Sequence, residues 1–475
     1  MAKVSYGRRV GELADRDPEA VAFVCGEQEL RRGELEARTN RRARTYAERG
    51  VGAGDLVTLA LPNGLELVEA CIATWKLGAV PNPISPRMPL AERARIVERA
   101  QPALVIDSEE EPTPSLPDGP LPDRTPPHER ALASGGSTGT PKLILPANPG
   151  SYDPEAPSPL FTARHAALVP GPLSHAVPFS AAFQGVFGGA TAVLLPRFDA
   201  AETLAAVERH RVDRMHVVPT MMLRIWRLPE AERLSRDVSS LDFVMTGSAP
   251  CPAWLMRAWI DWLGPDVLCE AFGPSERIGG TFITGREWLA HPGSVGKPSA
   301  ASQLRILDPE TGAPLPTGEL GEIYMLPATG PGSTYRYVGS EARRTPDGWE
   351  SVGDMGWLDA DGYLYLGDRR TDMILTGGRN VYPAEVEAAL TEHPDVRSCC
   401  VIGLPDEDLG NRVHALVELS APISDDALRD HLRALLVAWK LPRTFERVDG
   451  ALRDDAGKAR RAALRSARLP GGGEA

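Results

Sequence analysis

The chain has 475 residues, more than one hydrophobic core usually supports, so we expect at least two domains. Its 42% hydrophobic and 24% charged residues are typical of a globular protein, and a formal net charge of -12 argues against a mainly nucleic-acid-binding role. No run of 18 apolar residues occurs, so the sequence does not support a membrane span.

Short apolar runs alternate with amphipathic segments of helical length from residue 21 to residue 106. We expect strands over 21–25, 56–61, 80–84 and 103–106, and helices over 32–49, 65–77 and 89–99. This alternation predicts βαβ units on a parallel sheet. Residues 107–130 are acidic, rich in proline and without periodicity, which predicts an exposed connection.

A glycine-rich run, Ala-Ser-Gly-Gly-Ser-Thr-Gly-Thr-Pro-Lys, follows at residues 133–142. Glycines let backbone N–H groups approach an anion, and hydroxyls and a lysine add donors, so the run predicts a phosphate-binding loop. Lys142 stands three residues beyond the last glycine and behind a proline, which is not the Walker pattern. The alternative is a flexible surface loop, which an isolated run of this kind more often forms. The candidate phosphate ligands are Ser134, Gly135, Gly136, Ser137, Thr138, Gly139 and Lys142.

The alternation of strands and helices resumes after residue 190. Strands are expected over 192–195, 214–218 and 243–246, and helices over 201–211, 221–226 and 253–263. Two successive α/β blocks predict two doubly wound lobes with a crevice between them. After about residue 293, short β segments separated by Gly and Pro, one pair joined by Asp361-Gly362, predict a small β-barrel.

The chain beyond Asp368 mixes strands with helices expected over 383–391 and 425–437, opened by Pro383 and Ser424. It is long enough to form a domain of its own. The predicted fold class is therefore α/β, with an N-terminal domain of two doubly wound lobes plus a small β-barrel over residues 1–368. A small α+β C-terminal domain is expected over 369–475.

The six cysteines form no C-x-x-C pair and no metal-ligand spacing with histidine, which indicates reduced thiols. The first residues of the sequence lack the apolar core of a signal peptide. We therefore expect a cytoplasmic protein.

An aromatic ring, a tight turn, a hydroxyl and a carboxylate follow an apolar strand in Phe272-Gly273-Pro274-Ser275-Glu276. Such a set can stack on a base, hydrogen-bond a phosphate and ligate Mg²⁺ through one carboxylate. The alternative is an ordinary turn at the end of a strand.

Together with these two motifs, five further segments resemble the adenylate-forming superfamily of acyl- and aryl-CoA synthetases, peptide-synthetase adenylation domains and firefly-type luciferases. They are Gly247-Ser248-Ala249-Pro250, Gly353-Asp354, Arg369 with Asp372, Gly-Gly-Arg-Asn-Val-Tyr-Pro-Ala-Glu-Val-Glu at 377–387, and Gly457-Lys458 with Arg460-Arg461. The seven matches occur in family order and cover essentially the whole chain. The phosphate loop and residues 372–383 look most like ligases of bulky cyclic acids, including bile-acid-type ones.

The resemblance implies an ATP-dependent acid–CoA ligase, which joins a small-molecule carboxylic acid to AMP and then to coenzyme A. It implies that Ser137, Thr138 and Lys142 hold the leaving phosphates and that Glu276 holds Mg²⁺. Lys458 would bridge the α-phosphate and the acid, so Lys458, Glu276, Thr138 and Lys142 are the implied catalytic residues. The other implied nucleotide contacts are Phe272 and residues Gly247, Ser248, Ala249 and Pro250 at the adenine, Asp354 and Arg369 at the ribose, and Gly273 and Ser275.

The resemblance also implies that the C-terminal domain rotates near Asp368–Thr371 between the two half-reactions. Gly377, Gly378 and Arg379 would then face the pantetheine arm of coenzyme A. Three positions depart from the family pattern: Gly135 replaces a hydroxyl, Ser275 replaces threonine, and Thr371 stands at the usual hinge position.

The acid itself is not predicted, because the acyl pocket of such enzymes is built from scattered residues. The candidates are His175, Phe179, Gly247, Ile278 and Gly279. His175 is either a lid on the acyl site or an ordinary structural histidine.

Three rival functions stay open. The first is a half-reaction enzyme, which only adenylates for a carrier protein or only transfers a preformed adenylate to a thiol. The second uses another nucleophile in a biosynthetic pathway, and the third is a non-catalytic nucleotide-binding module. The sequence also leaves a homodimer open.

Overall fold

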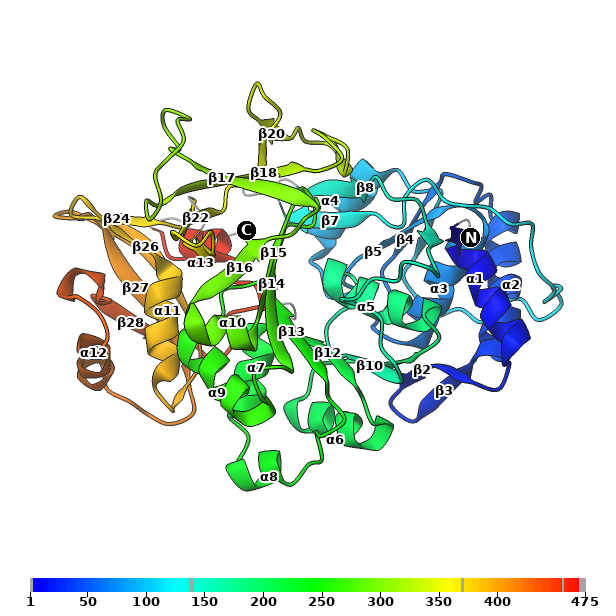
Figure 1. Cartoon of the computed structure of the whole chain (residues 1–475), viewed down its shortest axis with the longest axis horizontal. Coiled ribbons are helices and arrows are strands. Elements are labelled where there is room, and N and C mark those ends of the chain that lie inside the picture. The colour runs from blue at the N-terminus through cyan, green and yellow to red at the C-terminus, as the bar shows by residue number, and fades with distance from the viewer. Residues whose placement is uncertain (1–2, 136–140, 369–370, 455–456, 470–475) are drawn as a thin grey trace.

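The computed structural model describes residues 3–135, 141–368, 371–454 and 457–469, which form a large N-terminal part and a smaller C-terminal part packed against one side of it (Figure 1). The N-terminal part is organised around a large mixed sheet with a parallel centre. The order of the central strands is β2 (Val21–Cys25), β11 (Thr191–Leu194), β10 (Ala166–Val169), β12 (Arg214–Val217), β13 (Phe243–Gly247) and β14 (Leu268–Phe272). These strands are mutually parallel, and β3 (Gln28–Arg31) runs antiparallel at the β2 edge.

The N-terminal block is divided between two sheets. Strand β2 pairs with β11, with Phe23 opposite Ala192, although the sequence pattern groups β2 with its neighbours in the chain. The following strands, β4 (Leu56–Leu59), β5 (Val80–Pro83) and β6 (Leu104–Ile106), form a separate parallel sheet in the order β5-β4-β6. The two α/β sheets correspond to the two lobes that the sequence predicts.

Helices cover these sheets, and most lie within a few residues of their predicted ranges. The helices of the N-terminal part are α1 (Tyr6–Arg16), α2 (Arg32–Glu48), α3 (Leu65–Lys76), α4 (Leu90–Ala100), α5 (Ala176–Phe187), α6 (Ala200–His210), α7 (Pro219–Trp226), α8 (Glu230–Leu234), α9 (Ala253–Leu263) and α10 (Gly285–Ala290). Helix α5 carries the centre of the core, where Phe179, Phe183 and Phe187 pack with the fully buried Trp75. Each edge-to-face pair, Trp75 with Phe179 and Trp75 with Phe183, adds up to about 1.5 kcal/mol beyond its buried area.

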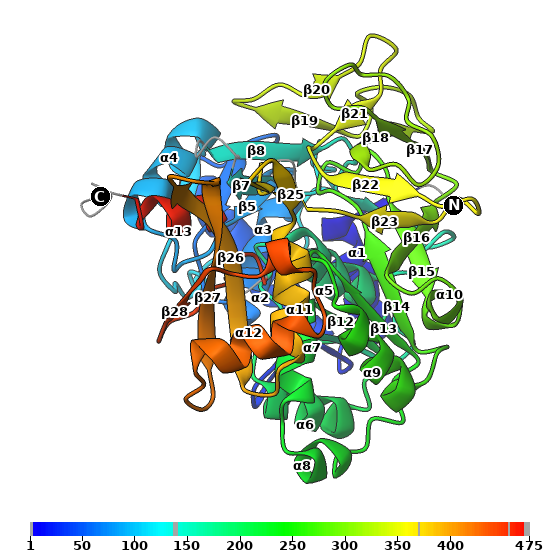
Figure 2. The ribbon, with the colours of Figure 1, turned by 90° about the vertical axis from the view of Figure 1, so that its left-hand side faces the viewer.

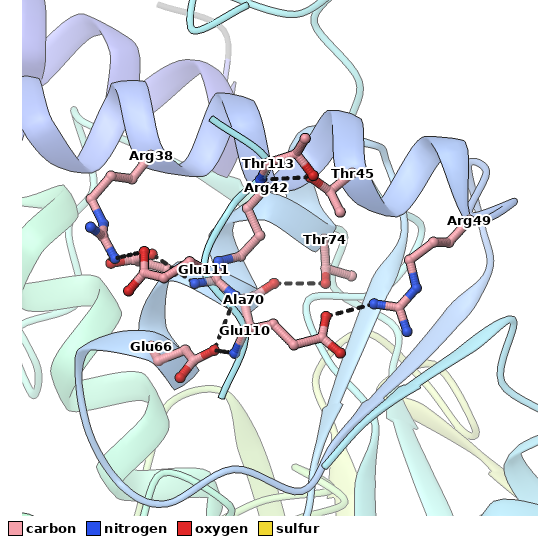
Figure 3. Close-up of polar contacts among 11 residues, drawn as sticks. Arg38, Arg42, Thr45, Arg49, Glu66, Ala70, Thr74, Glu110, Glu111 and Thr113 are labelled. Atoms are coloured by element: carbon pink, nitrogen blue, oxygen red, sulfur yellow. Dashed lines mark hydrogen bonds and ion pairs between the residues drawn. The ribbon is translucent and has the colours of Figure 1, made fainter. Parts of the chain in front are cut away.

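The segment 107–130 has no helix or strand, as predicted, but it is not a loose connection. Glu110 pairs with Arg49, the C-cap residue of α2, at 2.7 Å, and its backbone N–H donates to Glu66 of α3 at 2.6 Å (Figure 3). The Thr45 and Thr113 hydroxyls add a bond of 3.2 Å. A second ion pair, 3.4 Å between Arg38 of α2 and Glu111, adds to this attachment, so acidic residues fasten the segment to basic residues of the helix and its cap. Composition alone does not reveal these contacts.

The predicted phosphate loop connects two strands of a third sheet. Strand β7 (Leu132–Gly135) pairs antiparallel with β8 (Pro141–Pro146), which also pairs with β19 (Tyr335–Val338). Gly136, Ser137, Thr138, Gly139 and Thr140 lie outside the described residues, as does Arg369.

The β-rich region after residue 280 continues the large sheet. The strands of this region are β15 (Thr281–Thr284), β16 (Ser294–Pro298), β17 (Ser302–Leu307), β18 (Gly321–Pro327), β20 (Arg343–Arg344), β21 (Glu350–Ser351), β22 (Met355–Leu358) and β23 (Leu364–Leu366). Strand β15 pairs antiparallel with β14 and then with β16, which joins the predicted barrel strands to the parallel centre. The hairpin predicted at Asp361-Gly362 joins β22 to β23.

The C-terminal part has a hydrophobic cluster of its own, which includes Val386, Leu390, Val401, Val417 and Leu428. Its elements are β24 (Ile374–Thr376), β25 (Arg379–Val381), α11 (Pro383–Glu392), β26 (Val396–Asp406), β27 (Gly410–Leu419), α12 (Asp425–Arg433), β28 (Thr444–Arg447) and α13 (Arg461–Ser466). Strands β26, β27 and β28 form one sheet, with α11 packed against β26 (Figure 2). Two short strands, β1 (Val4–Ser5) and β9 (Ser151–Tyr152), pair near the N-terminus.

All six cysteines are free thiols. None of the described helices combines the length and apolarity that a bilayer crossing needs.

Candidate active site

A cavity of about 1580 Å³ lies where the two parts of the chain meet. Its walls come from the ends of β12, β13 and β14, from the start of α5, and from the C-terminal part. Parallel strands present their carboxyl ends at one edge of a sheet, where ligands of α/β folds commonly bind. Thirteen predicted site residues line it: Lys142, His175, Gly247, Ser248, Ala249, Pro250, Phe272, Gly273, Ser275, Glu276, Gly279, Asp354 and Lys458.

Lys142 and Glu276 form the charged centre of the cavity. The Lys142 Nζ lies 3.2 Å from the Glu276 Oε1, and the Glu276 side chain is only 7% exposed. Thr334 Oγ1 donates to the backbone carbonyl of Glu276 at 3.0 Å, which fixes the chain at this residue. A lysine and one carboxylate in contact fit a site that takes both a phosphate and a divalent cation.

Tyr337, which belongs to none of the sequence motifs, joins this pair. Its hydroxyl donates to Glu276 Oε1 at 2.5 Å and accepts from Lys142 Nζ at 2.6 Å, and the Lys142 ammonium lies 3.9 Å from the ring centroid. Burial and the Glu276 carboxylate raise the pKa of Tyr337, so its hydroxyl keeps its proton at neutral pH. Tyr337 lies beside Lys142 because strand β19 pairs with β8, a contact that no local sequence pattern predicts.

We expect Tyr337→Phe to weaken ATP use without unfolding the protein. The variant keeps the ring beside Lys142 but removes both hydrogen bonds of the hydroxyl, the one to Glu276 and the one from Lys142. A hydrogen bond to a charged group contributes about 1.5–3 kcal/mol when it is buried. Because the hydroxyl is only half-buried, we expect about a five- to tenfold loss of acid-dependent ATP–pyrophosphate exchange. An unchanged exchange rate would show that the hydroxyl does not orient Glu276.

The turn after β13 requires its glycine. A Cβ on Gly247 would lie 2.4 Å from the Ala271 carbonyl oxygen, and Ser248 adopts a φ of 69°. The turn therefore lies against the end of β14, close to Phe272. A nucleobase site between this turn and Phe272 requires that closeness.

Glu270 is a cavity residue that was not predicted as a site residue. It lies on β14 opposite Thr246 of β13 and is 4% exposed. Burial raises the pKa of Glu270 to about 8, so the carboxyl is mostly protonated at neutral pH and can donate a hydrogen bond.

Lys458 reaches the cavity from a loop of the C-terminal part, and Glu387 binds residues on both sides of it. Glu387 pairs with Arg453 at 2.5 Å and with Arg461 at 2.8 Å, one on each side of Lys458. The backbone N–H of Lys458 donates to Asp454 Oδ1 at 2.9 Å. These contacts give structural roles to Glu387 and Arg461, which both belong to the matched motifs.

The loop also lies directly against the large N-terminal part. A Cβ on Gly457, whose φ is 76°, would lie 2.7 Å from the Thr220 hydroxyl. Glycine is thus needed for the close approach that brings Lys458 to the cavity.

Two acyl-pocket candidates point away from the cavity. Phe179 is 2% exposed and packs on Trp75 and Phe183, and Ile278 is 1% exposed within the cluster around Leu132. Neither side chain is among those that line the cavity in the described structure, because each fills the hydrophobic core instead.

The predicted pantetheine segment also lies outside the cavity. Gly377 and Gly378 form the exposed turn between β24 and β25, with φ values of 55° and 75°, and Arg379 stacks over Trp439 at 4.7 Å. In this orientation of the C-terminal part, Lys458 rather than the glycine pair lines the cavity.

The chain matches two protein-family models, one after the other along the sequence. The description "AMP-binding enzyme" matches residues 11–124 and 131–337, and "AMP-binding enzyme C-terminal domain" matches residues 385–458.

Individual relatives match over nearly the whole chain. The 2-succinylbenzoate–CoA ligase of Bacillus licheniformis is 30% identical, over 95% of this chain and 97% of its own length. A feruloyl-CoA synthase of an Amycolatopsis species is 32% identical, over 92% and 93%. Among solved structures, the o-succinylbenzoate CoA synthetase of Bacillus subtilis with its acyl-adenylate intermediate superposes with a TM-score of 0.81 at 26% identity, covering 98% of this chain and 99% of that one.

Proposed function

The chain belongs to the AMP-binding enzyme family, and we propose that it is an ATP-dependent acid–CoA ligase acting on a cyclic or otherwise bulky carboxylic acid. A carboxylate is a poor electrophile, so it first attacks the α-phosphorus of ATP, and pyrophosphate leaves. The thiol of coenzyme A then attacks the acyl-adenylate, and AMP leaves. Curated relatives named for 2-succinylbenzoate and ferulate, both aromatic acids, support the substrate class.

One observation supports this function most directly. The Lys142–Glu276 pair, Asp354 and Lys458 are far apart in the sequence but line the same cavity. Preorganised charges that face one reacting phosphate are the main contribution a protein makes to such a transfer.

The residues present fit the groups that the reaction requires. Mg²⁺ prefers one or two carboxylates together with substrate phosphates, and Glu276 offers one buried carboxylate at the cavity wall. When bound there, the ion would neutralise charge on the phosphates of ATP. Lys142 would hold the β- and γ-phosphates, Asp354 the ribose, and Lys458 the α-phosphate next to the acid.

Pyrophosphate release tests the function. The enzyme is incubated with ATP and a panel of aromatic, alicyclic and fatty acids, with and without coenzyme A. We expect adenylate formation with at least one cyclic acid and thioester formation when coenzyme A is added. Adenylate without thioester would favour an enzyme that serves a carrier protein or another nucleophile, and ATP binding without pyrophosphate release would favour a binding module.

We also propose that residues 369–475 form a mobile domain that rotates between the two half-reactions. Arg227, which follows α7, donates through Nη2 to the carbonyl oxygens of Thr391 and His393 at 2.8 and 2.9 Å. These carbonyls end α11, where a positive charge is favoured by the helix dipole. A second contact, between Arg460 and Glu92 of α4, measures 2.9 Å. Rotation would break both contacts.

We therefore expect Arg227→Ala to shift the balance between the half-reactions. Arg227→Ala removes two charge-assisted bonds that the proposed rotation would break, so it should slow adenylate formation about tenfold relative to thioester formation from supplied adenylate. The comparison variant is Arg236→Ala, which removes only a surface ion pair with Glu208. Equal effects of Arg227→Ala on both half-reactions would argue against a rotation.

The free thiols support a cytoplasmic location, since disulfides are rare there. A homodimer stays a prediction.

A further inference from the structure

The backbone at Arg277 is strained directly beside Glu276. Arg277 has a φ of 56°, in the left-handed region that residues other than glycine rarely adopt. Its N–H donates to the Pro274 carbonyl at 3.0 Å, which closes the turn that follows β14. Such a conformation costs about 1–3 kcal/mol and persists only where surrounding contacts hold it.

The contact that holds Arg277 is an ion pair with a buried carboxylate. Arg277 Nη2 donates to Glu129 Oε1 at 2.6 Å, and the Glu129 side chain is 7% exposed. Arg130 lies 2.7 Å from the same oxygen, and Trp75 Nε1 donates to the Glu129 backbone carbonyl at 2.7 Å. Burial opposes ionisation, but the two guanidinium groups hold the pKa of Glu129 below its usual range, so it stays charged.

Glu129 and Arg277 belong to the two segments that carry Lys142 and Glu276 to the cavity. Glu129 precedes β7, from which the chain runs into the predicted phosphate loop and on to Lys142. Arg277 directly follows Glu276. The ion pair therefore ties the two segments together at one end, and the Lys142–Glu276 contact of 3.2 Å joins them at the other.

We propose that Arg277 is a positioning residue: its ion pair with Glu129 sets the placement of Glu276 relative to Lys142, and so the affinity of the site for Mg²⁺ together with ATP. The inference rests on the proposed function, in which Glu276 holds the ion. Arg277 itself need not touch ATP, because its guanidinium is directed at Glu129. The alternative is direct contact with a phosphate, since the side chain is 32% exposed at the cavity.

The test measures ATP binding by calorimetry, without acid, over a series of Mg²⁺ concentrations. In Arg277→Gln we expect the Mg²⁺ concentration for half-maximal ATP binding to rise about tenfold. ATP affinity at saturating Mg²⁺ should stay within about threefold of the parent. Arg277→Lys, which keeps a charge able to reach Glu129, should show a smaller shift.

Arg277→Gly separates the ion pair from the backbone strain. Glycine relieves the left-handed conformation but removes the anchor, so we expect the same Mg²⁺ shift as in Arg277→Gln. Recovery of parent behaviour in the glycine variant would overturn the role of the ion pair. Weaker ATP binding by the same factor at every Mg²⁺ concentration would overturn it in favour of direct phosphate contact.

A double-mutant cycle with Glu129→Gln tests the pair itself. Glu129→Gln removes the counter-charge of the buried Arg130 and should lower the melting temperature. This loss of stability occurs equally in Glu129→Gln and in the double variant. We expect the Mg²⁺ shifts of Arg277→Gln and Glu129→Gln not to add, and additive shifts would contradict the proposal.

Arg305→Gln is the matched control, since Arg305 pairs with Asp347 on the surface, and it should leave the Mg²⁺ dependence unchanged. A loss of melting temperature in Arg277→Gln without a Mg²⁺ shift would mean that Arg277 is only structural. The binding assay needs no acid, so absence of turnover with every acid would reject the proposed function and leave this result standing.

Discussion

Glu276→Gln should reduce acid-dependent ATP–pyrophosphate exchange at least about a hundredfold. The amide nearly preserves shape but removes the negative charge that would hold Mg²⁺, and a metal contact contributes several kcal/mol to the transition state. The fold should tolerate the change, because the amide oxygen can still accept the 2.5 Å hydrogen bond from Tyr337. The loss should therefore appear in the exchange rate and not in the melting temperature.

The Mg²⁺ dependence gives this prediction a second readout. The residual exchange of Glu276→Gln should need a higher Mg²⁺ concentration than the parent. Glu310→Gln is a suitable control, because Glu310 lies on an exposed turn away from the cavity. Parent-like exchange in Glu276→Gln would exclude Glu276 as the ligand.

Several regular elements with a clear apolar period were predicted from the sequence, although the amphipathic helix α1 was not. The helix expected over 253–263 is α9, and the strand expected over 21–25 is β2. Helix α5 was not predicted because it is apolar on most sides, so it has no polar face to define a helical period. The pairing of β2 with β11 was also beyond local patterns, since distant tertiary packing decides which strands meet.

The site, like the fold, was predictable in part. Motifs predicted which segments reach the cavity, because each segment carries its own chemistry. They could not predict which side chains of a segment turn inward. On α5, Phe179 and Phe183 repeat every four residues and enter the core, whereas Ser180 and Gln184, one position further along, line the cavity.

Contacts between distant segments were the least predictable part. Tyr337 meets Lys142 and Glu276 only because β19 pairs with β8, and Arg277 meets Glu129 across 148 positions of the sequence. Neither residue follows a local pattern that distinguishes it from other exposed tyrosines or arginines.

Lys458→Ala should separate the two half-reactions, which is the largest effect that we expect. In this orientation the loop held by Glu387, Arg453 and Arg461 brings Lys458 to the cavity wall. A preorganised ammonium facing the charge that develops at the α-phosphate contributes several kcal/mol, so acyl-adenylate formation should fall by about two to four orders of magnitude. The substitution should leave the backbone around residue 458 in place, because the hydrogen bond from Lys458 to Asp454 is donated by the backbone N–H.

Thioester formation from supplied acyl-adenylate and coenzyme A should stay within about threefold of the parent rate in Lys458→Ala. A group that acts in only one transition state affects only that step, and rotation of the C-terminal domain would move Lys458 away before the thiol attacks. Lys440→Ala is the control within the same domain, because Lys440 pairs with the exposed Glu385 at 2.5 Å and does not line the described part of the cavity, so both half-reactions should be retained. Equal loss of both half-reactions in folded Lys458→Ala protein would make the lysine structural or exclude the rotation. If the parent accepted only preformed adenylate, the enzyme would catalyse the second half-reaction alone, and Lys458 would have no adenylation step to serve.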